Sequence, residues 1–146
     1  MSKILVFYYS RTGNTEKMAN AVAEGAKAAS ADVELEYHVA ADDLGRFDAV
    51  IVGAPTYHHE MPFGVKRLFE EAAEKSVSLK GKVGAAFGSY GWSGEAPKLV
   101  LEVMKNKFEM RVLEPPLLVK DTPNQTNLNA CRDLGKRVSE SLIRES

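Results

Sequence analysis

The sequence predicts an α/β fold in which a parallel sheet is covered by helices on both faces. Three short apolar runs, at residues 4–9, 48–54 and 82–88, lack the alternation of a half-exposed strand, so we expect each to be buried on both faces. Patterns of helical period follow all three runs. Strands that alternate with helices along a chain form parallel sheets, because each helix packs back onto the sheet. We therefore expect one three-layer α/β/α domain over residues 1–146.

The first half of the chain predicts three strands, a long helix and a short irregular segment. The segment 33–39 alternates apolar and polar residues, which is typical of an edge strand, and His38 falls on its polar, exposed side. In chain order we expect a strand, a helix, this edge strand, a turn or half-helix and a second buried strand, at residues 4–9, about 15–29, 33–39, 42–44 and 48–54.

The second half continues the alternation of helices and strands. Pro62 suits the first position of a helix, where its missing N–H would have no partner anyway. Two apolar segments flank Pro115, and we expect them to form one kinked strand, since proline is confined to edges and irregular points of a sheet. The expected elements are a helix, a buried strand, a helix, the kinked strand and a last helix, at residues 62–74, 82–88, 95 or 97 to 107, 110–113 with 116–119, and about 126–144.

Composition excludes several classes of function. With a formal net charge of −1 over 146 residues, the chain has no basic excess for nucleic acid or a membrane surface. No apolar run approaches the roughly 18 residues of a membrane span. Cys131 is the only cysteine, which rules out an internal disulfide and a CxxC site; we expect a half-buried structural thiol. The chain opens directly on a strand without a leader, so the cytoplasm is the expected compartment.

A polar loop of hydroxyl, glycine and amide side chains connects the first strand to its helix. The free N–H groups of a first helical turn, and the positive end of the helix dipole, favour a phosphate. Gly13 allows a close approach and a positive φ. A capped turn without a ligand is the alternative. The candidate phosphate-binding residues are Ser10, Arg11, Thr12, Gly13, Asn14 and Thr15.

Three loops are expected to meet at one edge of the sheet. A strand order of 2-1-3-4-5 brings together the loops after the first, third and fourth strands, outside their carboxyl ends. Tyr57 and Trp92 would make walls for a flat ring, so a mononucleotide is indicated and flavin mononucleotide (FMN) fits best; the alternative is that both only cover the rim of the sheet. The further candidate residues are Pro55, Thr56, Tyr57, His58, His59 and Glu60 in the second loop, and Ser89, Tyr90, Gly91, Trp92 and Gly94 in the third.

Other ligands of such sheets lack their motifs. A receiver domain needs clustered aspartates where the first strand ends, and residues 8–10 contain none. Neither the lysine of a Walker loop nor a GxGxxG fingerprint is present. His58 and His59 are adjacent and point differently, without further ligands at suitable spacing, so we expect no metal site. We expect no catalytic side chains either.

The two glycine-containing loops resemble those of flavodoxins. Ser10–Thr15 is similar to the flavodoxin phosphate loop, and 87–92 is similar to the third flavin loop of short-chain clostridial flavodoxins and of the flavodoxin module of flavodiiron proteins. The resemblance spans the whole chain and implies a flavodoxin-like fold with FMN held without a covalent bond. It further implies that Ser10, Thr12, Asn14 and Thr15 hold the phosphate, Trp92 and Tyr57 stand at the two ring faces, Glu60 accepts a hydrogen bond from flavin N3–H, and the His58–His59 peptide faces N5.

The chain departs from that family in two ways. His58 stands where many relatives have a glycine whose peptide can flip, so we expect weaker stabilisation of the one-electron-reduced flavin; protonation of His58 or His59, favouring reduced anionic flavin, is the alternative. The chain is also nearly neutral, whereas typical flavodoxins are strongly acidic, and Arg11 lies within the phosphate loop. Arg11 either pairs with the phosphate or points to solvent.

The resemblance implies an electron carrier rather than an enzyme. FMN would shuttle low-potential electrons between redox partner proteins, a reductase or ferredoxin-linked donor and an acceptor that the sequence does not name. One alternative is a small NAD(P)H-dependent flavin or quinone reductase on the same fold. Another is a flavodoxin module that works within a larger redox assembly.

Overall fold

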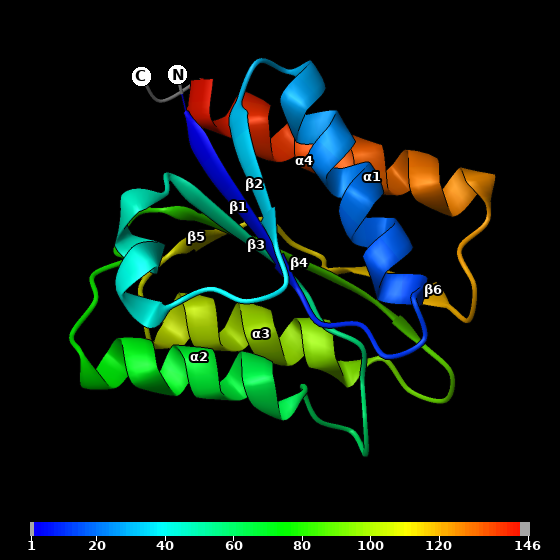
Figure 1. Ribbon diagram of the computed structural model, residues 1–146, viewed down its shortest axis with the longest axis horizontal. Coiled ribbons are helices and arrows are strands. Elements are labelled where there is room, and N and C mark those ends of the chain that lie inside the picture. The colour runs from blue at the N-terminus through cyan, green and yellow to red at the C-terminus, as the bar shows by residue number, and fades with distance from the viewer. Residues whose placement is uncertain (1, 144–146) are drawn as a thin grey trace.

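The computed structural model describes residues 2–143, and a parallel sheet forms its centre (Figure 1). The strand order is β2-β1-β3-β4-β5, with a sixth strand beside β4, and every pairing is parallel. This confirms the predicted fold class and strand order. The first four strands are β1, β2, β3 and β4, at Lys3–Tyr8, Asp32–Glu36, Ala49–Gly53 and Val83–Tyr90.

The expected kinked strand around Pro115 is instead two short strands. β5 (Arg111–Val112) pairs with the beginning of β4, and β6 (Leu117–Lys120) pairs with its end. The prolines at 115 and 116 carry no N–H, so the ladder of hydrogen bonds cannot continue through them. Both strands still occupy the same edge of β4, which is why the order of the first five strands is unchanged.

Helices cover both faces of the sheet, as predicted. α1 and α4 lie on one face, and α2 and α3 lie on the other (Figure 1). The expected half-helix at 42–44 is a 3₁₀ helix over Ala41–Arg46. The end of the last predicted helix, Arg144, lies outside the described residues. The bounds of α1, α2, α3 and α4 are Asn14–Ala28, Phe63–Glu74, Glu95–Asn106 and Gln125–Ile143.

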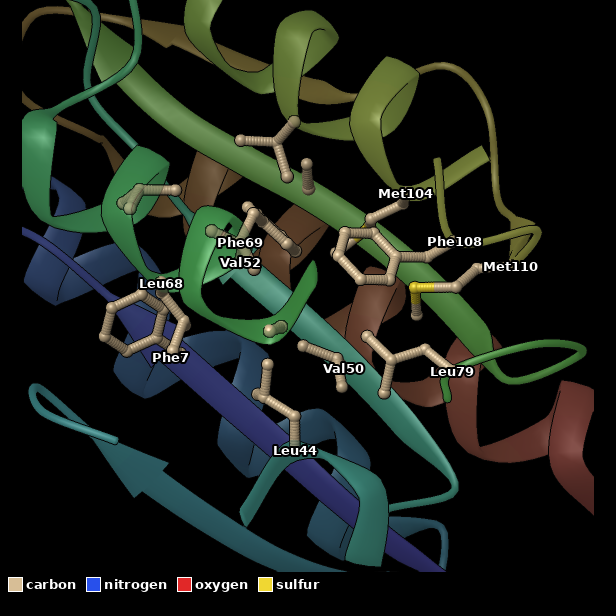
Figure 2. Close-up of a cluster of buried hydrophobic side chains, with 14 of the residues drawn as sticks. Phe7, Leu44, Val50, Val52, Leu68, Phe69, Leu79, Met104, Phe108 and Met110 are labelled. Atoms are coloured by element: carbon tan, nitrogen blue, oxygen red, sulfur yellow. The ribbon is translucent and has the colours of Figure 1, made fainter. Parts of the chain in front are cut away.

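The sheet separates two hydrophobic cores. Leu5 and Phe7 of β1 pack beneath α2 and α3, where Figure 2 shows Phe7 with Phe69, Met104 and other side chains. Ile4 and Val6 of the same strand pack on the opposite face, beneath α1 and α4. Successive side chains of a strand point to opposite faces, so both cores require apolar residues at consecutive positions. The predicted burial on both faces is confirmed for residues 4–7, whereas Tyr8 and Tyr9 are half-buried.

The two helices of the second core approach each other closely at glycines. A methyl group on Gly25 of α1 would lie 1.9 Å from the carbonyl oxygen of Arg132, and one on Gly135 of α4 would lie 2.0 Å from that of Val22. Cys131 belongs to this interface and is fully buried rather than half-buried, because α1 covers its face of α4. Burial raises the pKa of Cys131 to about 12, which keeps the thiol protonated at neutral pH.

Two further expectations concern surface properties. His38 is exposed, as predicted, but it lies beyond β2, which spans Asp32–Glu36 instead of the expected 33–39. Among residues 2–143, no helix is long and apolar enough to cross a membrane.

The Gly135→Ala substitution is expected to lower the free energy of unfolding by about 1–3 kcal/mol, because the added methyl group overlaps the backbone of α1. The matched control is Gly64→Ala in α2, where a methyl group would meet nothing within 4 Å. That change should stabilise the protein by about 0.5–1 kcal/mol, since alanine favours a helix over glycine. Urea unfolding measures the free energy of unfolding of both variants. Equal changes for Gly135→Ala and Gly64→Ala would contradict the close packing of α1 on α4.

Candidate functional site

The three predicted loops surround a cavity of about 740 Å³ at the carboxyl ends of the strands. Each loop follows one of the three neighbouring strands β1, β3 and β4, so their meeting is a direct result of the strand order. A second cavity, of about 730 Å³, lies at the amino ends of the strands near Asp48 and Lys82 and shares no residue with the loops. The first cavity is lined by Tyr9, Arg11, Thr56, Tyr57, His58, His59, Trp92 and Ser93.

The first loop is arranged as a set of hydrogen-bond donors at the N-terminus of α1. Ser10 Oγ accepts bonds from the N–H groups of Gly13 (3.1 Å) and Glu16 (3.2 Å), which leaves its own hydroxyl hydrogen to donate elsewhere. Gly13 has φ 92°, a conformation that favours glycine. Within residues 2–143 the N–H groups of Asn14 and Thr15 have no protein partner. With the positive end of the α1 dipole, this donor set fits a phosphate.

Thr15 has a different place from the other residues of this loop. Its side chain is buried, Oγ1 lies 3.0 Å from Ser89 Oγ, and it accepts a 3.3 Å bond from the Ser89 N–H. The hydroxyl group is therefore bound to the end of β4, and the backbone N–H of Thr15, free among residues 2–143, is a donor at the loop. Thr12 is exposed at the outer side of the loop.

The second loop contains a tight hairpin. Tyr57 and Glu60 exchange backbone hydrogen bonds of 3.1 and 2.9 Å, and the two residues between them, His58 and His59, have φ values of 50° and 66°. Two positive φ values are typical of a type I′ turn, which normally contains asparagine or glycine. A residue with a Cβ in the left-handed region costs about 1–2 kcal/mol, so this turn is strained at both positions.

The first residue of this hairpin, Tyr57, packs against other aromatic side chains. Tyr57 is half-buried and meets the ring of Tyr9 edge-on, with 6.2 Å between ring centroids, and Tyr9 stacks on Tyr37. Burial raises the pKa of Tyr57, which therefore stays protonated in the neutral range. The sequence analysis did not assign Tyr9 or Tyr37 to the site. Tyr9 is the last residue of the first apolar run and so the first at the carboxyl end of β1, which is the signal that points to it.

Arg11 lies over the ring of Tyr57, with its guanidinium carbon 5.2 Å from the ring centroid. The sequence left two positions open for Arg11, toward a phosphate or toward solvent. The structure shows a third, in which the cation is attracted by the face of an aromatic ring. This contact covers one face of the Tyr57 ring, and both residues line the cavity.

The third loop contributes Trp92 and Ser93 to the cavity lining. Trp92 is 92% exposed and lines the cavity, whereas Tyr90 is half-buried and lies against Gly94. A methyl group on Gly94 would lie 3.2 Å from the Tyr90 ring, so glycine permits this close packing. Gly91 is exposed and does not line the cavity.

Two predicted residues of the second loop lie outside the cavity lining. Pro55 is buried where β3 ends, and Glu60 is exposed at the end of the hairpin. Among residues 2–143, no three histidine, cysteine, aspartate or glutamate side chains gather as a metal site would require.

The second and third loops are joined at the first turn of α3. Thr56 Oγ1 accepts a 2.8 Å bond from the N–H of Ala96, and His59 Nδ1 lies 2.5 Å from Glu95 Oε2. Ser93 Oγ lies 3.2 Å from the same His59 nitrogen. Hydrogen bonds from Ser93 and then His59 lower the pKa of Glu95, so its carboxylate is ionised at neutral pH. Sequence reasoning missed Glu95, whose contact with His59 spans 36 residues and has no periodic pattern.

A comparison with protein families matches residues 6–135 to the flavodoxin model. The chain belongs to the flavodoxin family. It is 33% identical to a flavodoxin of Clostridium beijerinckii over 92% of this chain and 97% of that protein. It is also 37% identical to the type A flavoprotein fprA of Rhodobacter capsulatus, over 95% of this chain and 33% of that protein. The chain thus spans about a third of the length of this larger flavoprotein.

Solved structures give the same result. A flavodoxin from the domain Archaea superposes with a TM-score of 0.90 and 36% identity, covering 97% of this chain and 99% of that one. The flavodiiron core of Flv1 from Synechocystis sp. PCC6803 superposes with a TM-score of 0.88 and 25% identity, over 99% of this chain and 37% of that one. Both comparisons therefore place the chain in the flavodoxin family, whose cofactor is FMN.

The Thr15→Val substitution is expected to lower the free energy of unfolding by about 1–3 kcal/mol, because it leaves the buried Ser89 without its partner. In the double variant Thr15→Val with Ser89→Ala, the free energy of unfolding should fall by less than the sum of the decreases in the two single variants. The double variant removes both buried polar groups and leaves neither without a partner. Urea unfolding of the four proteins measures this coupling. Additive losses would show that the bond does not hold the loop to β4.

Proposed function

We propose that this flavodoxin binds FMN in the cavity between the three loops and exchanges single electrons with partner proteins there. The observation that supports this most directly is a cavity lined by Tyr57 and Trp92, next to a loop that carries a phosphate donor set and contributes Arg11 to the lining. In this arrangement the phosphate lies on Ser10 and the backbone amides of Asn14 and Thr15. The flavin ring lies between Tyr57 and Trp92. FMN supplies reversible one- and two-electron chemistry, and the protein binds, orients and presents it.

The phosphate donors and the aromatic side chains would contribute to FMN binding in different ways. The N-terminus of α1 offers partial positive charge and N–H donors that match the phosphate. The aromatic walls exclude water from the ring faces and contribute about 1 kcal/mol beyond burial. Thr12 is a further hydroxyl donor at the outer side of the phosphate. Because Trp92 is at the surface, the ring edge beside it is within reach of a docked partner protein, which suits electron transfer without a bound small substrate.

An NAD(P)H-dependent reductase is the second candidate. A relative named NAD(P)H dehydrogenase (quinone), from Acidovorax ebreus, is 39% identical in an alignment 113 positions long that covers 61% of this chain and 56% of that protein. Membership of a larger redox assembly is a third candidate, favoured by the length of the Rhodobacter relative. The carrier is our preferred proposal because 92% of the chain aligns with a protein named flavodoxin, whereas 61% aligns with the NAD(P)H dehydrogenase.

Trp92 provides a direct test, because it is the only tryptophan. Titration of the apoprotein with FMN should quench its emission by more than half, since the indole would stack on the flavin, and the protein should gain a flavin absorption spectrum. Adenosine monophosphate, which carries a phosphate but no flavin, is the control ligand. FMN binding without a change in tryptophan emission would place the ring away from Trp92.

Addition of NADH or NADPH to the FMN-loaded protein separates the carrier from the reductase. We expect bound FMN to stay oxidised for minutes with either nucleotide alone and to be reduced rapidly once a flavodoxin reductase is added. The measurement is the loss of flavin absorbance under anaerobic conditions. Rapid bleaching by a nucleotide alone would favour the reductase.

The Ser10→Ala substitution tests the phosphate position. It removes a hydroxyl donor and the acceptor that orders two loop amides, so we expect FMN to bind about tenfold more weakly, equal to about 1.4 kcal/mol. Riboflavin, which has the same ring but no phosphate, should bind the variant and the parent alike. An equal loss for both ligands would show that Ser10 acts on the ring site or on the fold instead.

A further inference from the structure

We propose that Glu95 is a positioning residue for the hairpin Tyr57–Glu60, which it holds through His59. The role of this hairpin beside FMN rests on the proposed function, whereas the holding of the hairpin is a property of the protein alone. Neither the family comparison nor the sequence analysis assigns a role to Glu95. The inference follows from contacts on both sides of the hairpin and from the conformation of the hairpin itself.

The hairpin is fastened to α3 at two points. On its N-terminal side, Thr56 Oγ1 accepts the N–H of Ala96, and inside the turn His59 Nδ1 bonds to Glu95 Oε2. Glu95 and Ala96 are consecutive residues in the first turn of α3, so both bonds lead to the same rigid element. The position of the hairpin over the cavity is therefore set by α3 as well as by β3.

The hairpin needs such support because its own sequence disfavours its conformation. His58 and His59 both have positive φ values, and neither is a glycine or an asparagine. The reciprocal backbone bonds between Tyr57 and Glu60 close the turn but do not remove the strain at its two central residues. A contact from outside that exists only when His59 has this conformation shifts the equilibrium toward it.

The pair between His59 and Glu95 lies at the surface, where the two side chains are 67% and 41% exposed, but its carboxylate has further contacts. Exposed pairs usually contribute little, because two long side chains must be ordered in water. Here Glu95 is fixed at the start of a helix and also bonds to Ser93, and its second oxygen, Oε1, is enclosed without a protein partner among residues 2–143. A carboxylate with one enclosed oxygen depends more strongly on the partners of the other oxygen, which are groups of the two flavin loops.

The first experiment uses the apoprotein and measures amide hydrogen exchange at Glu60, whose N–H bonds to Tyr57 within the hairpin. In the Glu95→Gln and His59→Leu variants we expect about fivefold faster exchange at this amide, and no further increase in the double variant. Leucine is chosen because asparagine would favour the left-handed conformation by itself. Glu102→Gln is the matched control, since it makes the same charge change on an exposed part of α3.

The second experiment measures the two midpoint potentials of FMN bound to the same variants. A hairpin released from α3 can reorient its central peptide toward the flavin. Glu95→Gln should therefore raise the equilibrium constant for forming the one-electron-reduced flavin about threefold, which widens the separation of the two potentials by about 28 mV. Glu102→Gln should leave the separation unchanged. In the His59→Leu background, Glu95→Gln should have no further effect, because its action passes through His59.

Two results would overturn the proposal. One is unchanged exchange at Glu60 in the Glu95→Gln variant, and the other is an equal effect of that substitution with and without His59. If FMN does not bind but the exchange rates change as expected, the proposed function fails and the positioning role of Glu95 stands. If FMN binds and the exchange rates do not change, the proposed function stands and the positioning role of Glu95 fails.

Discussion

The buried contact between Thr15 and Ser89 fixes the phosphate loop relative to the rest of the site. It joins the first turn of α1 to the end of β4, across the end of β3 that lies between them. Gly53, the last residue of β3, leaves room for the Phe87 ring and the Thr15 methyl group beside this contact. A methyl group there would lie 2.5 Å from the Phe87 ring and 3.1 Å from Thr15. One absent side chain thus allows two strand ends and a helix N-terminus to meet at one place.

The site combines a rigid part with a strained part. The phosphate loop is held by β1, α1 and β4 and uses glycine where a positive φ is required. The hairpin at His58 and His59 uses positive φ without glycine, and its bonds to α3 offset that cost. Strain of this kind persists only where the surrounding structure compensates for it, and it is often found at functional sites. The end of the cavity at this hairpin is accordingly the part where single substitutions should have the largest effect on backbone conformation.

Local patterns in the sequence account for the fold and for the meeting of the three loops. Runs of apolar residues identified the buried strands, and the helix and loop signals between them required the parallel order. What the sequence did not reveal depends on contacts between distant residues. Thr15 meets Ser89 across 74 positions and His59 meets Glu95 across 36, and neither pair leaves a periodic signal. Arg11 was equally undetermined, since its flexible side chain is placed by the ring of Tyr57 in another loop.

The contact of Arg11 with Tyr57 is compatible with a flavin ring in the cavity, as the magnitudes show. An exposed cation–π contact is worth about 0.5–1 kcal/mol. Covering one face of the Trp92 indole buries about 100 Å² of apolar surface, or about 2.5 kcal/mol at 25 cal/mol per Å², and Tyr57 adds a further share. Stacking of the ring therefore outweighs the loss of the Arg11 contact. The guanidinium group, once displaced, lies in the same loop as the phosphate donors, where a charge-assisted bond offsets the cost of moving it.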